Sequence, residues 1–172
     1  AYQQSYDATP GFSNDASGRA MFLNGNEVQQ LPLVISEILL RNVSTLPDEN
    51  GVYSDLVELS NLSEEPISLD RYFLSDDLQD RFAYRLPAYT LLPGAFVVIH
   101  CDGENYVSAD GVVHANFAIS LGETLVLTAH NGDYTMLPAE YAGEDISVFL
   151  DENGSYITGM PSVGYENTEA GA

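Results

Sequence analysis

The side chains best able to do chemistry in this chain gather around one acidic turn. Asp48, Asn50 and Asp55 offer oxygen atoms within a stretch of eight residues. Ca²⁺ takes six to eight oxygen ligands, so this loop is the best candidate for a calcium site. The spacing differs from an EF-hand loop, since Val52 and Tyr53 stand where further ligands are needed. Turn chemistry is the alternative, because Asp and Asn side chains also bond their own backbone.

Three histidines offer nitrogen ligands or a catalytic base, at His100, His114 and His130. None has a second ligand at a spacing typical of zinc sites, such as two His residues four apart or a Cys-x-x-Cys pair. The pattern favours separate roles, with a local structural hydrogen bond for His114. The sole cysteine, Cys101, ends a strand-like run that begins at Phe96, which favours a structural thiol over a nucleophile.

The motifs of common hydrolases and kinases are missing from the sequence. It contains neither a Gly-x-Ser-x-Gly nucleophile elbow nor a Gly-rich phosphate loop. Two of the 26 acids could still meet in space as a glycosidase carboxylate pair, with Asp76 and Asp77 as one example. The sequence therefore indicates a protein that is not an enzyme, and it leaves a two-carboxylate hydrolase as a less favoured possibility.

The charge balance disfavours two classes of partner. The 172 residues carry 26 acids against five arginines and no lysine, a net charge of −21. Nucleic acids and anionic membrane surfaces are bound mainly through basic side chains, so both are disfavoured. No apolar run is long enough for direct membrane insertion. Cations, cationic proteins and neutral glycans remain open as partners, and the charge also serves solubility alone.

The tyrosines raise the possibility of a carbohydrate-binding module. The chain has eleven tyrosines and no tryptophan. Tyr53, Tyr72, Tyr84 and Tyr89 fall near the ends of strand-like segments, where aromatic rings can stack on sugars. Half-buried positions with a solvated hydroxyl are the more common role for such residues.

Short apolar segments separated by turn signals must position all of these side chains. They are rich in β-branched and aromatic residues, a pattern typical of an antiparallel sandwich or barrel. The segments are residues 33–40, 56–59, 67–69, 72–74, 82–86, 96–99, 117–119 and 124–128. An Asn-Gly pair at 131–132 predicts a hairpin with a type I′ turn, and the pairs at 50–51 and 153–154, each after Asp-Glu, repeat the signal.

These segments predict two sheets with about seven to nine strands in total. The residues expected to supply much of the core are Val34, Ile35, Ile38, Val57, Leu59, Leu69, Leu74, Val97, Ile99, Leu125 and Leu127. Helix is expected only at residues 15–23.

Three segments, in order, resemble the signature of the lamin tail domain, an immunoglobulin-like β-sandwich. They are Asp55-Leu56-Val57-Glu58-Leu59-Ser60-Asn61, Leu74-Ser75-Asp76-Asp77 and Leu92-Pro93-Gly94-Ala95-Phe96-Val97-Val98. Leu56 departs from the family pattern, which usually has Trp there. The resemblance covers roughly residues 31–167. It implies an all-β, immunoglobulin-like antiparallel sandwich that is not itself known as an enzyme, and whose bacterial relatives accompany surface or secreted enzymes.

The two ends of the chain share the pattern Gly-aromatic-x-Asn-x-x-x-Gly, at residues 11–18 and 164–171. Residues 9–14 also resemble the closing segment of bacterial lamin tail domains. Residues 1–30 are therefore expected to be the end of a preceding unit plus an N-terminal connector. Residues 31–167 form the domain and 168–172 begin the next connector, in a piece of a longer, tandem protein.

The expected function is a non-catalytic binding or spacer module of a bacterial surface or secreted multidomain protein. It would mediate adhesion or the targeting of a neighbouring domain, from an extracellular or cell-surface location. The expected partners are neighbouring domains of the same chain and a protein or glycan ligand that the sequence does not name. No cofactor is expected, with Ca²⁺ left open.

Overall fold

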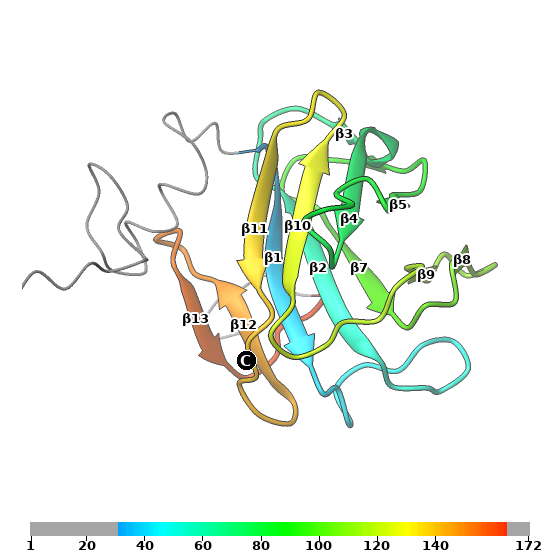
Figure 1. The fold of residues 1–172 in the computed structure, drawn as a ribbon, viewed down its shortest axis with the longest axis vertical. Coiled ribbons are helices and arrows are strands. Elements are labelled where there is room, and N and C mark those ends of the chain that lie inside the picture. The colour runs from blue at the N-terminus through cyan, green and yellow to red at the C-terminus, as the bar shows by residue number, and fades with distance from the viewer. Residues whose placement is uncertain (1–30, 165–172) are drawn as a thin grey trace, which may run out of the picture. The chain divides into compact units, whose positions relative to one another are not determined.

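The computed structural model describes residues 31–164, which belong to a compact unit spanning Leu31–Ala172 (Figure 1). The helix expected at residues 15–23 lies outside the described residues. Within them, strands dominate, and the helical element is a single 3₁₀ turn, η1 (Leu69–Arg71).

The larger sheet has seven strands, and the longest strand described, which has eight residues, lies near its centre. In spatial order they are β13 (Tyr156–Gly159), β12 (Ile146–Leu150), β1 (Leu33–Leu40), β2 (Asp55–Asn61), β7 (Phe96–Cys101), β9 (Val113–His114) and β8 (Tyr106–Val107). Neighbouring strands are antiparallel except β7 and β9, which run parallel. That parallel pair matters below, because it places His114 beside His100.

A four-stranded sheet packs against the larger one to form the sandwich (Figure 1). Its order is β11 (Tyr134–Pro138), β10 (Thr124–Ala129), β4 (Tyr72–Ser75) and β5 (Tyr84–Arg85). A separate pair, β3 (Ile67–Ser68) and β6 (Thr90–Leu91), completes the strands described. The prediction of an all-β sandwich is confirmed.

The main core lies between the two sheets and follows the two-residue alternation of the strands. On β1 the alternation changes phase. Leu33 and Ile35 face the core, and after a bulge between Ile35 and Glu37 the core-facing residues are Ile38 and Leu40. A bulge adds one residue to one strand and so shifts the faces of those that follow. It turns Glu37 to the outer face of the sheet.

Most of the expected core is confirmed. Nine of the eleven residues named above belong to the main core cluster, and Val97 is partly buried against it. The remaining residue, Val34, is buried but lies outside that cluster. Two expected strands are wrong in extent. Only Tyr84–Arg85 of segment 82–86 pairs as a strand, because residues 80–83 form a turn in which the Ala83 amide donates to Asp80 O (3.2 Å). Segment 117–119 contributes one isolated bridge, between Asp102 and Ala118. The structure describes thirteen strands in three sheets, more than the seven to nine strands in two sheets that the sequence predicts. Eight of them have four or more residues and five have two.

The hairpin predicted at residues 131–132 is confirmed by the pairing of β10 with β11, but its turn type is wrong. A type I′ turn needs positive φ at both central residues, and here only Gly132 has it, at 94°. The Gly132 amide donates to Ala129 O (2.8 Å), and the Ala129 amide donates to Asp133 O (2.7 Å). The loop is therefore longer than the two-residue loop of a type I′ hairpin, and Gly132, near its end, is its one residue with positive φ.

The same turn recurs at the two Asp-Glu-Asn-Gly sequences. The Gly51 amide donates to Asp48 O and the Gly154 amide to Asp151 O, at 3.1 and 3.0 Å. Each aspartate amide donates in turn to the residue four positions on, at 2.8 Å in both cases. Gly51 and Gly154 take φ of 80° and 78°. Three separate Asn-Gly signals thus produce one turn geometry.

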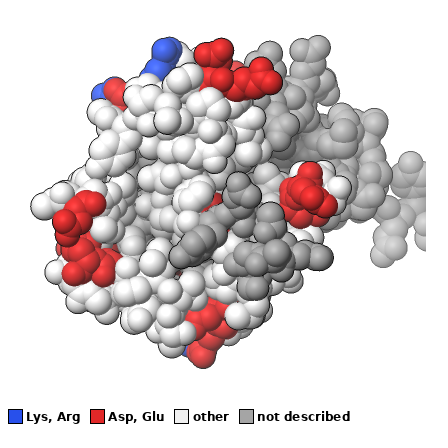
Figure 2. All heavy atoms as spheres, turned by 180° about the vertical axis from the view of Figure 1, so that it is seen from behind, with Lys and Arg blue, Asp and Glu red and all other residues white. Residues whose placement is uncertain are grey.

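The acids form separate groups with uncharged surface between them on the face shown in Figure 2. Residues 31–164 contain no helix long and apolar enough to span a membrane.

Candidate functional site

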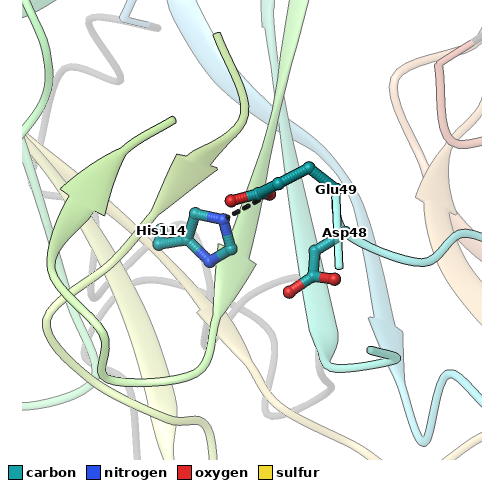
Figure 3. Close-up of side chains that lie close together, drawn as sticks. All are labelled: Asp48, Glu49 and His114. Carbon is teal, nitrogen blue, oxygen red and sulfur yellow. Dashed lines mark hydrogen bonds and ion pairs between the residues drawn. The ribbon is translucent and has the colours of Figure 1, made fainter. Parts of the chain in front are cut away.

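Side chains from four parts of the larger sheet meet at one of its ends, and Figure 3 shows three of them, those of Asp48, Glu49 and His114. Asp48 and Glu49 come from the connection between β1 and β2, and His114 ends β9. Asp102 directly follows β7, and Tyr106 begins β8. The strand order places β9 between β7 and β8, so His114 has His100 paired on one side and Tyr106 on the other. Residues 65 positions apart in the chain meet in this way.

The imidazole of His114 is buried and fully engaged. Its Nδ1 lies 2.6 Å from Asp102 Oδ2, and its Nε2 lies 3.0 Å from Glu49 Oε2. The ring stacks on Tyr106, with centroids 4.2 Å apart and planes 7° apart, and on His100 at 5.3 Å and 25°. The residue is 0% exposed. Ring position and orientation are therefore set from both faces and through both nitrogens.

The hydrogen bonds shift the acidities of this group. The Tyr106 hydroxyl donates to Glu49 Oε1 (2.5 Å), which lowers the pKa of Glu49 to about 2 and raises the pKa of Tyr106 to about 12. Burial lowers the pKa of His114, but its hydrogen bonds with Asp102 and Glu49 outweigh burial and raise it overall. Burial, with the neighbouring His114, lowers the pKa of His100. At neutral pH Glu49 is a carboxylate.

Asp48, Glu49 and His114 can hold a metal ion together, and we call these three residues the loop–β9 site. Each contributes one donor atom, and the three atoms lie within 4.8 Å of one another. Two carboxylates and an imidazole suit Zn²⁺, which takes nitrogen and oxygen ligands. Ca²⁺ prefers an all-oxygen set. A carboxylate on the second ring nitrogen is typical of metal-binding histidines, and Asp102 occupies that position on Nδ1.

The residues predicted for calcium are only partly gathered here. Asp48 belongs to the loop–β9 site, and its Oδ1 also accepts the amides of Asn50 and Val52, both at 2.8 Å. This second role is the turn chemistry that the sequence also allows. Asp55 opens β2, where its Oδ1 accepts the Arg41 amide (2.8 Å), and it is not one of the three donors. Burial raises the pKa of Asp55.

The histidines and the cysteine have distinct positions. His130 is exposed and lies 2.6 Å from Arg71, so it does not join His100 and His114. His100 bonds Ser54 Oγ through Nδ1, at 2.9 Å. The expectation of a local bond for His114 is wrong, because its partners lie 12 and 65 positions away. Cys101 is buried, which raises the pKa of its thiol, as a structural role requires.

The tyrosines near the strand ends divide into buried and exposed residues. Tyr72 and Tyr84 are core residues, whereas Tyr53 and Tyr89 are 43% and 39% exposed and remain open to a ligand.

The adjacent acids Asp76 and Asp77 lie in the turn after β4. Asp77 accepts the amide of Gln79 (2.8 Å), a turn bond. Burial raises the pKa of Asp76. The bond of Asp77 is the local chemistry expected of an acid in a turn.

Sequence reasoning missed a second polar group, on the outer face of β1 and β2. Glu37 and Glu58 lie opposite each other there and are 0% and 1% exposed. Glu37 accepts the amide and hydroxyl of Ser162, at 3.0 and 2.8 Å. Glu58 accepts the Gly164 amide (2.8 Å) and the Ser36 hydroxyl (2.7 Å). The available signal is a glutamate in the middle of an otherwise apolar strand.

The loop–β9 site carried a weaker sequence signal. Asp48 and Glu49 belong to one turn and His114 to β9, and the parallel pairing of β7 with β9 contributes to bringing them together. No protein-family model matches the chain, and no curated protein matches it. The case for function therefore comes from the residues and their geometry.

Proposed function

We propose that this chain is a non-catalytic β-sandwich module that binds a transition-metal ion such as Zn²⁺ at Asp48, Glu49 and His114. The observation that carries the proposal is the position of His114. Asp102 holds its Nδ1, and its Nε2 faces the carboxylate of Glu49 with Asp48 close by. The bound ion would join the β1–β2 connection to β9 and would keep positions open for water or for a ligand from a partner.

A structural role for the module is supported by how its acids are used. Asp145 accepts hydrogen bonds from the amides of Val43 and Ser44 and from the hydroxyls of Ser44 and Thr45, across about a hundred residues of chain. Glu37 and Glu58 hold the segment that contains Ser162 and Gly164. These carboxylates connect chain segments, as a spacer that must keep its shape requires.

The biological setting belongs to the proposal and rests on the resemblance to lamin tail domains. In this setting the module belongs to a bacterial surface or secreted multidomain protein. It spaces a neighbouring domain or targets it to a protein or glycan. Glycan binding is the second candidate, because Tyr53 and Tyr106 are 43% and 39% exposed, and Tyr106 stacks on a residue of the metal site.

Calorimetric titration of the EDTA-treated chain with Zn²⁺ tests the proposal. We expect one Zn²⁺ per chain, bound at least a hundredfold more tightly than Ca²⁺ or Mg²⁺ because of the imidazole ligand. Asp48→Asn and Glu49→Gln should each weaken Zn²⁺ binding at least tenfold. Asp151→Asn and Glu152→Gln change the same amino acids in the second Asp-Glu-Asn-Gly turn and should leave the affinity within twofold.

Two results would reject this site. One is the absence of saturable Zn²⁺ binding. The other is an equal loss of affinity from the two pairs of variants, because that would show a diffuse attraction of cations to an acidic surface. Asn retains the oxygen that caps the turn, so Asp48→Asn is designed to keep the fold.

A further inference from the structure

The outer face of β1 and β2 binds the chain's own closing segment, residues 161–164, through a defined set of contacts. We call the surface made by Glu37, Leu39, Leu56 and Glu58 the receptor face. Its two carboxylates accept three hydrogen bonds from the amide and hydroxyl of Ser162 and the amide of Gly164. Leu39 and Leu56 form a separate apolar cluster with Val163, to which Leu46 and Val98 also pack.

These contacts specify a sequence. The first position supplies a hydroxyl and an amide, as Ser162 does. The second supplies an apolar side chain, and within residues 31–164 the amide of Val163 donates no hydrogen bond, so a residue without an N–H is compatible there. The third must be glycine, because Gly164 has φ of 85° and must also donate its amide. The receptor face therefore recognises Ser or Thr, then an apolar residue, then Gly.

Two other stretches of the chain fit this pattern. Ser120-Leu121-Gly122 is already held in the turn before β10, where the Ser120 amide donates to Glu123 Oε2 and the Gly122 amide donates to Ala139 O. The other is Thr9-Pro10-Gly11. Thr9 has the hydroxyl and amide of the first position. Pro10 is apolar and lacks only the N–H that the second position does not use. Gly11 matches the third position. The likeness continues beyond the three residues, with Phe12, Asn14 and Gly18 in step with Tyr165, Asn167 and Gly171.

We propose that the receptor face also accepts residues 9–11 of a second copy of this chain, which take the place of residues 162–164. Such an exchange joins the start of one copy to the sheet of another. Because the two surfaces involved are different, the contact does not close on itself and can extend into a linear series. In the intact chain the tethered closing segment competes at high effective concentration, so exchange is rare until that segment is weakened. This inference is independent of the metal site.

Peptide binding to the full chain tests the exchange. The probe is a fluorescent peptide of residues 7–15, and binding is measured by anisotropy at physiological salt. Gly164→Ala strains the closing segment at a position of positive φ, and we expect this variant to bind the peptide about fivefold more tightly than the unchanged chain. Gly154→Ala is the matched control, since Gly154 also has positive φ (78°) but donates its amide to Asp151 O within the turn between β12 and β13 and does not contact the two glutamates of the receptor face. It should bind the peptide as weakly as the unchanged chain.

Changes in the peptide test the recognition without altering the fold. Thr9→Val and Gly11→Ala peptides should each bind the Gly164→Ala chain at least tenfold more weakly. Equal binding by all three peptides, or no binding by any, would overturn the proposal.

Sedimentation velocity tests the pairing of copies. The Gly164→Ala chain should associate as its concentration rises, and adding Gly11→Ala should restore the monomer. A Gly164→Ala chain that stays monomeric at millimolar concentration would refute association between copies.

Discussion

Two turns of this protein have the same four residues and the same backbone hydrogen bonds, yet only one of them faces a histidine. In both turns the aspartate side chain accepts the amides two and four positions on. The distances are 2.8 Å and 2.8 Å for Asp48, and 2.9 Å and 2.8 Å for Asp151. These bonds contribute to a lowered pKa for both aspartates, with the bond from the residue four positions on as the largest cause.

The turns differ in what lies opposite the glutamate. Glu49 meets His114 and Tyr106 across the end of the sheet. Within residues 31–164, Glu152 forms no side-chain hydrogen bond and no ion pair. Local sequence accounts for the shape of each turn, and the neighbouring strands decide whether its acids can form a site. Each residue of the turn at 151–154 is therefore a matched control for the residue at the equivalent position of the turn at 48–51.

The largest expected effect is the loss of His114. His114→Ala in EDTA removes a buried ring with two stacking partners and two hydrogen bonds, and should lower the free energy of unfolding by about 3 kcal/mol. His130→Ala changes an exposed histidine and should stay within about 0.5 kcal/mol of the unchanged chain. Urea unfolding measures both. Equal effects would mean that the His114 ring is not packed as described.

A smaller effect tests the equality of the two turns. Gly51→Ala and Gly154→Ala each place a side chain at φ near 80°, and an added Cβ at either position meets no atom within 4 Å. Only backbone strain remains, so each should cost about 1 kcal/mol. The two costs should agree within the error of urea unfolding. A clear inequality would show that the turns differ in backbone as well as in surroundings.

The pH dependence of Glu49 separates the turns again. The pKa of Glu49 is about 2 in the folded chain, and its ordinary value, which applies to the unfolded chain, is 4.5. A lowered pKa contributes stability above pH 4.5, and the contribution is lost as the pH falls from 4.5 towards 2. In EDTA, Glu49→Gln should therefore lower the melting temperature at pH 6 and have little effect near pH 2.

Glu152→Gln is the control for this pH series and should have little effect at any pH. Thermal unfolding across the series measures both variants. A deficit of Glu49→Gln that grows as the pH falls would contradict the assignment.

The smallest effect expected is that of salt, which acts on both turns alike. The net charge of −21 should weaken the fold through self-repulsion. Raising the ionic strength to about 0.1 M screens exposed charges beyond about 10 Å, so the melting temperature should rise by a few degrees. An unchanged melting temperature in EDTA would contradict this expectation, because it would show that the acids are too far apart to repel one another appreciably.

The fold was predictable from sequence because apolar alternation and Asn-Gly turns are local signals. The cores of β2 and β10 follow directly from that alternation, through residues such as Leu59 and Leu127. The bulge in β1 was not predictable, because it depends on how Glu37 pairs with β2. Nor was the parallel pairing of β7 with β9, which depends on packing across the sheet.

The candidate metal site was predictable only in part, because it too depends on the pairing of strands that are distant in the sequence. The acidic loop and Asp48 are visible in the sequence as possible ligands. Glu49 and His114 meet only because β9 lies beside β7. The receptor face was missed because two glutamates inside apolar strands reveal nothing of the segment that they bind.

The most direct test of the central claim is the anomalous scattering at the zinc edge from crystals of the chain grown with equimolar Zn²⁺. We expect one strong peak that lies about 2.0 to 2.2 Å from His114 Nε2 and from carboxylate oxygens of Asp48 and Glu49. The Asp151 turn should show none. A peak at Asp151 and Glu152 of equal height, or no peak beside His114, would contradict the account, because it would mean that the strands opposite the turn do not determine where metal binds.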